Sequence, residues 1–260
     1  MASLQQQAAG AGKTQAGIER RRLAAAARRP QHVQTLLGRG LPPAIFMTDP
    51  RRTPDPLAIA ARLPSGWGVI YRHFGAANRF EIGTALARVC RLRRLVLLVS
   101  ADPELARSIG ADGIHWPQAR LHQRRRAPPG SRKLIETASA HSRGALIAAA
   151  RSGVDAAIVS SVFASHSGTA SAPMGVLRFR EMARTSPLPV YALGGVNADT
   201  AARITRGAQT QIAGWAAVDA IQAAWGQAAW GQAAWGQAAW GQAAWGQAAW
   251  GLRVWGKSED

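Results

Sequence analysis

Two apolar stretches in the second half of the chain end abruptly at small polar residues or glycines, a composition suited to binding a ligand. Residues Val190–Asn197 read Val-Tyr-Ala-Leu-Gly-Gly-Val-Asn, and residues Ala156–Phe163 read Ala-Ala-Ile-Val-Ser-Ser-Val-Phe. A helical pattern starts at Asn197, directly after the glycines. A strand, a glycine turn and a helix N-terminus together present backbone N–H groups to a phosphate. We therefore predict phosphate binding at Gly194 and Gly195; the alternative is a turn whose glycines only relieve crowding.

The elements that must position these residues alternate along the chain from Pro43 onward. Eight apolar runs have the length of strands, and the predicted strands are Ala44–Thr48, Gly68–Arg72, Leu95–Ser100, Gly113–Trp116, Lys133–Ser139, Ala156–Ser160, Pro189–Leu193 and Gln211–Ala217. The predicted helices are Pro54–Leu63, Phe80–Leu92, Pro103–Ile109, Ser142–Ser152, Val176–Arg184 and Asn197–Arg206, and the loop Pro117–Arg132 has no clear helix. Crossovers of this length require parallel pairing. The count favours a (β/α)8 TIM barrel over an open doubly wound sheet.

Length, charge and cysteine content narrow the class of protein. The chain has 260 residues and a formal net charge of +18. Its arginine clusters, Arg20–Arg22, Arg91–Arg94 and Arg124–Arg126, are scattered and lack interleaved aromatic residues, so we interpret them as solvated surface and expect no nucleic-acid partner. The single cysteine, Cys90, lies in a helical pattern, which favours a packed thiol and a cytoplasmic location. No apolar run reaches the ~18 residues of a membrane span, so we expect no membrane partner.

Three segments follow from these patterns. Residues 1–42 are rich in arginine and have no apolar signal-peptide core, and we expect a disordered basic extension. Residues 43–231 form the predicted barrel, and residues 232–260 are assigned to a low-complexity repeat tail.

Six copies of Gln-Ala-Ala-Trp-Gly occupy Gln222–Gly251. The first two copies therefore fall within the predicted barrel, and the other four fall within the tail. In a helix each five-residue step turns the tryptophan by about 140°, so no apolar stripe persists, and in a strand an odd period changes face at each copy. A barrel still needs a helix over its eighth strand, and Ile221, Ala224 and Trp225 continue an apolar face for a turn or two. We expect the first one or two copies to be structural and the others to be dispensable.

The residues at the predicted strand ends resemble the thiamine phosphate synthase and thiazole tautomerase (TenI-like) family from about Ile45 to Ile221. The resemblance rests on Thr48-Asp49, Arg72, Gly110–His115, Ser139–Ser142, Ser161–Phe163, Ala192–Asn197 and Ala216–Ile221. It implies a barrel that binds a phosphorylated thiazole or related heteroaromatic ligand in thiamine metabolism. The resemblance also implies substrate binding by Arg72, Ser139, Ser165 and Ser167, and phosphate binding by Gly194, Gly195 and Val218.

The synthase of this family couples a pyrimidine pyrophosphate to a thiazole phosphate with help from Mg²⁺, and the sequence departs from it where that chemistry needs charge. The family's Arg-x-Lys becomes Arg72-His73-Phe74, and its Asn-Asp metal pair falls on Ser100-Ala101, with Asp102 one position late. Its Gln-x-Asp becomes Gln118-Ala119-Arg120, its Thr-x-Thr-Lys loop becomes Ser165–Gly168, and a serine at the last phosphate turn becomes Asp219. We therefore predict no metal ligands, although the resemblance implies Mg²⁺, and expect weak coupling activity.

The tautomerase branch of the family uses a proton-shuttling histidine, and its position is occupied here by Ser161. His166 and His141 are our candidate catalytic residues, because a histidine with a pKa near neutrality is suited to proton transfer. His115 is expected to pack at a strand end. A catalytically silent ligand-binding or regulatory barrel and an arginine-driven nucleic-acid binder remain as alternatives, and self-association is left open.

Overall fold

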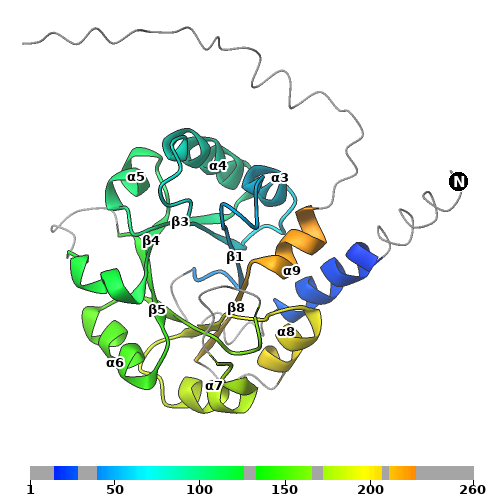
Figure 1. Cartoon of the computed structure of the whole chain (residues 1–260), viewed down its shortest axis with the longest axis vertical. Coiled ribbons are helices and arrows are strands. Elements are labelled where there is room, and N and C mark those ends of the chain that lie inside the picture. The colour runs from blue at the N-terminus through cyan, green and yellow to red at the C-terminus, as the bar shows by residue number, and fades with distance from the viewer. Residues whose placement is uncertain (1–14, 29–39, 126–132, 166–171, 207–210, 227–260) are drawn as a thin grey trace, which may run out of the picture. The chain divides into compact units, whose positions relative to one another are not determined.

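The computed structural model of the chain describes residues 15–28, 40–125, 133–165, 172–206 and 211–226. Within them eight parallel strands close into a barrel in chain order, with β8 pairing back onto β1. The strands are β1 Ala44–Met47, β2 Gly68–Tyr71, β3 Val96–Ser100, β4 Gly113–Trp116, β5 Ile135–Ala140, β6 Ala156–Val159, β7 Val190–Ala192 and β8 Ile212–Ala217. Figure 1 shows the helices as a ring around these strands. The predicted (β/α)8 TIM barrel is confirmed.

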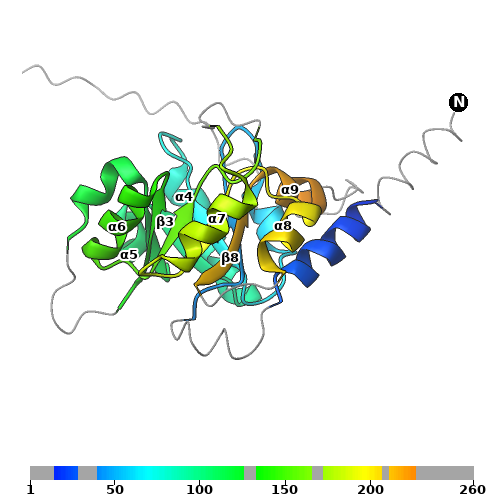
Figure 2. The same cartoon turned by 90° about the horizontal axis from the view of Figure 1, so that it is seen from below.

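Each of the six predicted helices is present, and most are shorter than the sequence pattern indicated. They are α3 Pro56–Ala60, α4 Arg79–Arg93, α5 Pro103–Ser108, α6 Arg143–Ser152, α7 Gly175–Arg184 and α8 Ala198–Thr205. A short 3-10 helix, Gln118–Gln123, follows β4 in the loop that was predicted to have no clear helix. Figure 2 shows the barrel from the side, with strands such as β3 and β8 between the helices that surround them. None of the described helices is long and apolar enough to cross a membrane.

Several helices begin where a short polar side chain follows a strand end. In each case an oxygen of the capping side chain accepts a hydrogen bond from a backbone N–H of the first turn, which would otherwise lack a partner. The capping residues are Asp55 for α3, Asp102 for α5, Ser142 for α6 and Asn197 for α8. These caps fix the direction in which the loops leave the carboxyl ends of the strands, where the candidate site lies.

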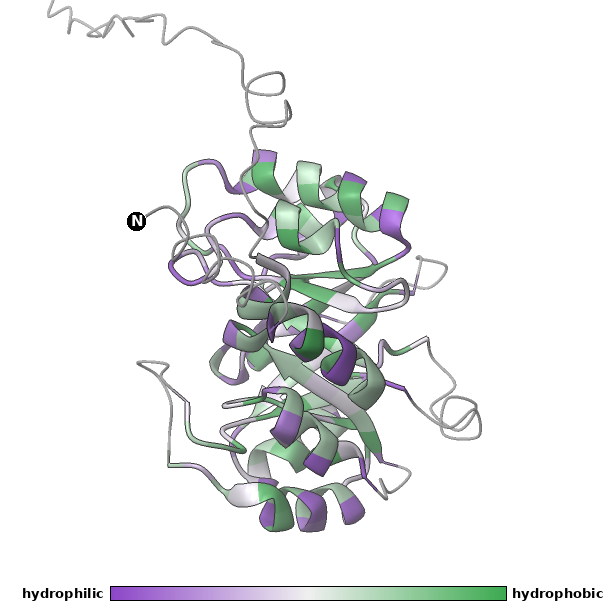
Figure 3. Ribbon diagram, turned by 90° about the vertical axis from the view of Figure 1, so that its right-hand side faces the viewer, coloured by the Kyte–Doolittle hydropathy of each residue, from purple (hydrophilic) through white to green (hydrophobic). Residues whose placement is uncertain are grey.

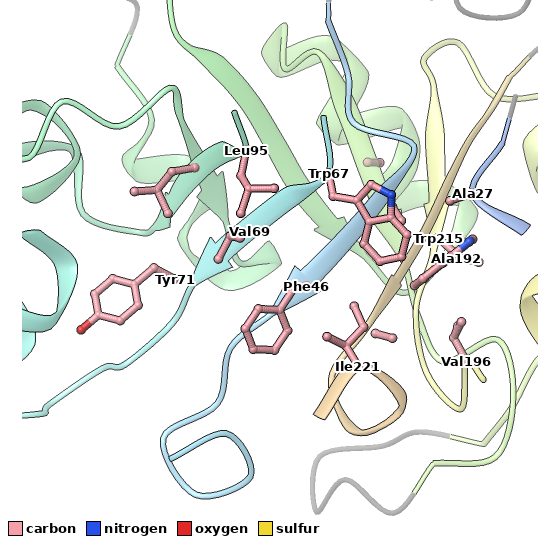
Figure 4. Close-up of a cluster of buried hydrophobic side chains, with 14 of the residues drawn as sticks. Ala27, Phe46, Trp67, Val69, Tyr71, Leu95, Ala192, Val196, Trp215 and Ile221 are labelled. Atoms are coloured by element: carbon pink, nitrogen blue, oxygen red, sulfur yellow. The ribbon is translucent and has the colours of Figure 1, made fainter. Parts of the chain in front are cut away.

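The apolar side chains form two separate clusters, one on each face of the barrel wall. The inner cluster fills the barrel and includes Ile45, Ile70, Leu98, Ile158 and Tyr191. The outer and larger cluster packs the strands against the helices, and Figure 4 shows part of it around Trp67 and Trp215. Figure 3 shows hydrophobic strands, with the hydrophilic segments concentrated on the helices and loops. Cys90 is buried in the outer cluster, and burial raises the pKa of its thiol to about 12, as expected for a packed thiol.

The first repeat copy completes the barrel, as predicted. Helix α9 spans Asp219–Ile221 and continues into one turn of π-helix over Gln222–Gly226. Ile221, Ala224 and Trp225 are all buried. The Trp225 ring meets Trp67 edge to face with 5.3 Å between centroids, and Trp67 meets Trp215 of β8 at 5.2 Å. The remaining copies lie outside the described residues.

Our expectation of a disordered basic extension over residues 1–42 was wrong for residues 15–26, which form a helix. Leu23 of this N-terminal helix is fully buried, and Ala26 and Ala27 join it in the outer cluster. The apolar face consists of one leucine and small alanines between arginines, so its composition resembles that of an unfolded basic segment. Burial against the barrel supplies the stability that composition alone does not predict.

Candidate functional site

A cavity of about 850 Å³ opens at the carboxyl ends of the strands. This end is where side chains and loops of a (β/α)8 barrel converge to form binding sites. Seven of the nine predicted site residues line it: Arg72, Ser139, His141, Ser165, Gly194, Gly195 and Val218. The other two, His166 and Ser167, lie outside the described residues. The strand ends therefore bring the described part of the predicted site into one cavity.

Arg72 follows β2 and is held at the cavity by the end of β1. Its backbone N–H donates to the Thr48 hydroxyl (3.0 Å), one guanidinium nitrogen lies 3.0 Å from the Met47 sulfur, and another lies 3.8 Å from Oδ2 of Asp49. Burial lowers the pKa of the guanidinium, and the Asp49 carboxylate partly opposes that shift. Arg72 is thus a partly desolvated cation facing the cavity, which strengthens its attraction for an anion.

Arg52 is a cavity residue that sequence reasoning missed. It lies in the loop after β1, where its guanidinium contacts both oxygens of Asp219 at 3.3 Å and Oδ2 of Asp49 at 3.4 Å. Burial raises the pKa of Asp49, but the backbone N–H groups of Arg52 and Arg51 and the Arg52 charge outweigh it, so the net pKa is lowered. The negative charge of Asp219, at the turn after β8, is therefore paired with the positive charge of Arg52. The only sequence signal for these ion pairs was the run Asp49-Pro50-Arg51-Arg52 after the first strand.

His115 of β4 packs at a strand end, as expected, between two hydroxyl groups of β5. Its Nδ1 lies 2.9 Å from the Thr137 oxygen, and its Nε2 lies 3.0 Å from the Ser139 oxygen. Complete burial, reinforced by the nearby Arg72 charge, lowers the pKa of His115 to about 3. The imidazole is therefore neutral at physiological pH, and it orients the Ser139 hydroxyl. The buried Ser100 hydroxyl lines the same cavity and has no hydrogen-bond partner among the described residues.

His141 lies at the end of β5 with one ring nitrogen fixed. Its Nδ1 is 3.0 Å from the Ser160 carbonyl oxygen and 3.1 Å from the Ser160 hydroxyl, and its backbone N–H donates to Oε1 of Gln118 at 3.1 Å. Because a carbonyl oxygen only accepts, the contact with Ser160 assigns the proton to Nδ1. In the neutral ring, Nε2 is then the nitrogen that can accept a proton from a ligand.

The glycine turn after β7 needs its glycines for two reasons. Gly194 and Gly195 have φ angles of +95° and +61°, a region that side chains with a Cβ rarely adopt. A Cβ on Gly195 would also lie 2.1 Å from the Ala164 carbonyl oxygen. The turn packs against the loop after β6, where the N–H groups of Val162 and Phe163 donate to the carbonyls of Leu193 and Gly194. The glycines thus relieve crowding, and the same turn places the N-cap residue of α8 at the cavity, so phosphate binding at this turn stays a prediction.

The N-terminal helix reaches the rim of the cavity, which sequence reasoning also missed. Gln15, Ala16 and Glu19 line the cavity. Oε1 of Glu19 accepts a hydrogen bond of 2.9 Å from the Ala198 N–H, the first residue of α8. Arg22, one turn further along, forms an ion pair with Asp199. No local pattern in residues 15–26 indicated this placement, because it depends on contacts with residues about 180 positions away.

The acidic residues near the cavity are engaged in caps and ion pairs. Asp102, which follows β3, accepts from the Leu105 N–H at 2.9 Å and lies 3.6 Å from the Arg79 guanidinium. Among the described residues, no group of three or more histidine, cysteine, aspartate or glutamate side chains is placed to hold a metal ion.

Comparison with known proteins places this barrel in a family. The sequence profile described as thiamine monophosphate synthase matches residues 45–221. Thiamine-phosphate synthase from Alcanivorax borkumensis is 31% identical over 193 residues, which cover 68% of this chain and 88% of that protein. Thiamine-phosphate synthase from a Synechococcus species is 31% identical over 170 residues, covering 64% of this chain and 47% of that protein.

A solved structure supports the same fold. Thiamine phosphate pyrophosphorylase from Pyrococcus furiosus superposes with a TM-score of 0.55 at 22% identity, covering 71% of this chain and 92% of that one. The profile match spans well over half of the chain, and it coincides with the barrel that carries the cavity. The chain is a member of the thiamine monophosphate synthase family.

Proposed function

We propose that this barrel binds a phosphorylated thiazole or a related phosphorylated heteroaromatic molecule in thiamine metabolism. The observation that carries the proposal is that Arg72, Gly194 and Gly195 line one cavity together with Asn197, the N-cap residue of α8. A guanidinium charge and helix N–H groups are the donors that bind phosphate in proteins. The volume of about 850 Å³ is within the usual range for a small-molecule site.

In this proposal each part of the cavity has a distinct role. The phosphate binds at Gly194, Gly195 and Val218, which line the cavity together with the α8 N-cap Asn197, and Arg72 supplies a positive charge. Ser139, held by His115, and Ser165 offer hydroxyl groups to the ring. The apolar side chains of Met47, Phe74 and Leu193 also line the cavity and provide surface for a flat ring; Ser167 remains a predicted contact outside the described residues.

The residues of this chain do not fit the Mg²⁺ that its family implies. Asp102 caps α5 and faces Arg79, and Asp219 is paired with Arg52. Arg120 stands where the resemblance places a metal carboxylate, and its guanidinium lies 5.7 Å from the centroid of the Phe74 ring. Oxygen ligands that are already neutralised by arginines have little attraction left for a hard cation. We infer that the pyrophosphate chemistry of the family is weak in this chain.

Two activities remain compatible with such a cavity. The first is a tautomerisation of a bound thiazole, in which Nε2 of His141 accepts a proton from one ligand atom and returns it to another while the Ser160 carbonyl holds Nδ1, with His166 as a second candidate. The second is ligand binding without turnover, as in a regulatory barrel. The engagement of the acidic residues by arginines is the observation that favours the second candidate.

A coupling assay separates a working synthase from these alternatives. Purified full-length chain is supplied with pyrimidine pyrophosphate, thiazole phosphate and Mg²⁺, and thiamine phosphate is measured. Removing one electrostatic donor from such a site commonly costs about 10²- to 10³-fold in rate, so we expect turnover at least about 100-fold below that of a relative assayed in parallel. Turnover of about 1 to 10³ per second, the ordinary enzyme range, would contradict the proposal.

A further inference from the structure

The N-terminal helix places a carboxylate at the position where the proposed ligand needs its anion site. Oε1 of Glu19 accepts the Ala198 N–H at 2.9 Å, and Ala198 is the first residue of α8. The N–H groups in the first turn of a helix lack intrahelical partners and lie at the positive end of its dipole. Glu19 therefore already occupies part of the donor set that a phosphate would use.

The helix is held in this position by packing as well as by polar contacts. Leu23 is fully buried and belongs to the same apolar cluster as Ala198 and Ala201 of α8. Arg22 pairs with Asp199 one position beyond Ala198. Figure 1 shows the N-terminal helix in blue beside α8. The carboxylate of Glu19 is thus presented by a docked element.

The charges around the cavity indicate that Glu19 and a phosphate exclude each other. Apart from histidines, the ionisable side chains that line it within the described residues are Arg52, Arg72, Glu19 and Asp219, two of each sign. Asp219 is already engaged by Arg52. A phosphate monoester would bring about 1.5 to 2 further negative charges. Withdrawal of Glu19 would restore both an excess of positive charge and the Ala198 donor.

We propose that Glu19 is a gating residue: its carboxylate competes with the anionic group of the ligand for the N-terminus of α8, and binding displaces it. This inference rests on the proposed phosphate-binding function and adds a means of control to the same site. The N-terminal helix then acts as a cover that opens when an anion of sufficient charge arrives. The Ser100 hydroxyl in the same cavity is buried and has no hydrogen-bond partner among the described residues, so it is a further polar group for a bound ligand to satisfy.

The test uses the full chain, inorganic phosphate as the probe, and the variants Glu19→Gln and Glu104→Gln. Glutamine keeps an oxygen that can accept the Ala198 N–H, so the helix remains docked while its charge is lost. Glu104 is the matched control, because it is an exposed glutamate in the first turn of α5 that does not line the cavity. We expect Glu19→Gln to tighten phosphate binding about tenfold in calorimetry, the effect of a carboxylate charge at a helix N-terminus. Glu104→Gln should change it less than about twofold.

Hydrogen exchange gives a second readout, which an unrelated charge effect would not change. In the unaltered chain, saturating phosphate should raise deuterium uptake in residues 15–26, because the displaced helix loses its contacts with α8. Equal phosphate affinity in all three proteins, or unchanged or reduced deuterium uptake in residues 15–26, would contradict the gating role of Glu19. Neither result would contradict the proposal that the cavity binds a phosphorylated ligand. If neither the unaltered chain nor Glu19→Gln binds phosphate, the proposed ligand class is wrong and the gate fails with it.

Discussion

His115 illustrates how a single residue of this site depends on burial. A lone histidine in a strand is an ambiguous sequence signal, and the structure resolves it as a neutral ring between Thr137 and Ser139. Its low pKa, caused first by burial and then by the Arg72 charge, rules out a role as a proton acceptor near neutral pH. The residue instead fixes the Ser139 hydroxyl that faces the cavity.

The low pKa of His115 predicts a pH dependence of stability. Between the ordinary histidine pKa of 6.5 and the folded value of about 3, the unfolded chain binds a proton that the folded chain does not. Stability therefore falls as pH decreases through this window, by about 1.4 kcal/mol per pH unit for this group. Urea unfolding between pH 6.5 and 5 gives the free energy of unfolding at each pH. His115→Gln should reduce the slope of that free energy against pH by about this amount. The exposed His122 serves as control, and His122→Gln should retain the original slope; parallel slopes for all three proteins would show that His115 is not buried and neutral.

Gly195 has both a positive φ and a close neighbouring carbonyl oxygen. Gly66 has a positive φ without such a neighbour, so comparing the two glycines separates the two effects. Gly195→Ala places a Cβ against the Ala164 carbonyl at a φ of +61°, whereas Gly66→Ala has a φ of +80° and no atom within 4 Å. Both variants should lose about 1 kcal/mol from backbone strain. Gly195→Ala should lose a further 1–3 kcal/mol, roughly the cost of overpacking. Chemical denaturation measures the difference, and equal losses would mean that the two loops do not approach closely.

Among the secondary-structure elements, the first repeat copy and the N-terminal helix show where sequence patterns are informative and where they are not. The five-residue period predicted that only the first turns after Ile221 can pack, and Trp225 is buried as that argument requires. The N-terminal helix was not predicted, because its apolar face consists of Leu23 and the small residues Ala24, Ala26 and Ala27. Helices of this kind form only against a partner surface, so their sequence alone contains too little signal.

Trp225 should account for much of the stability that the repeat contributes. It is 4% exposed and meets the Trp67 ring at 5.3 Å, and its carbonyl accepts from Arg62 at 3.2 Å. Trp225→Ala should destabilise the barrel by about 3–5 kcal/mol, the usual cost of deleting a buried aromatic side chain. Leu177→Ala removes a side chain that is 79% exposed and should change stability by less than about 0.5 kcal/mol. A loss of unfolding free energy below about 1 kcal/mol for Trp225→Ala would show that packing of the first copy against the barrel contributes little to stability.

At the scale of the whole molecule, the sequence was sufficient to predict the barrel but not the ion pairs around the cavity at the carboxyl ends of its strands. Most of the strands are continuous apolar runs because both of their faces are buried, and this is a strong local signal, although β5 contains Glu136, Thr137 and Ser139. The shared position of Arg72, Ser139 and Gly194 followed from the rule that strand ends converge. Arg52 and Glu19 could not be placed, since their partners Asp219 and Ala198 are more than 160 residues away in sequence.

The central claim is that the cavity binds a phosphorylated heteroaromatic ligand through its own residues, without Mg²⁺. Calorimetric titration of the full-length chain with thiazole phosphate, in the presence and absence of Mg²⁺, tests it directly. We predict saturable one-site binding whose Kd changes less than about twofold with Mg²⁺, and which weakens roughly tenfold or more in Arg72→Gln because a charged hydrogen bond is lost. The exposed Arg107 serves as control, and Arg107→Gln should bind as the unaltered chain does. Absence of binding without Mg²⁺, with tight binding on its addition, would contradict the account.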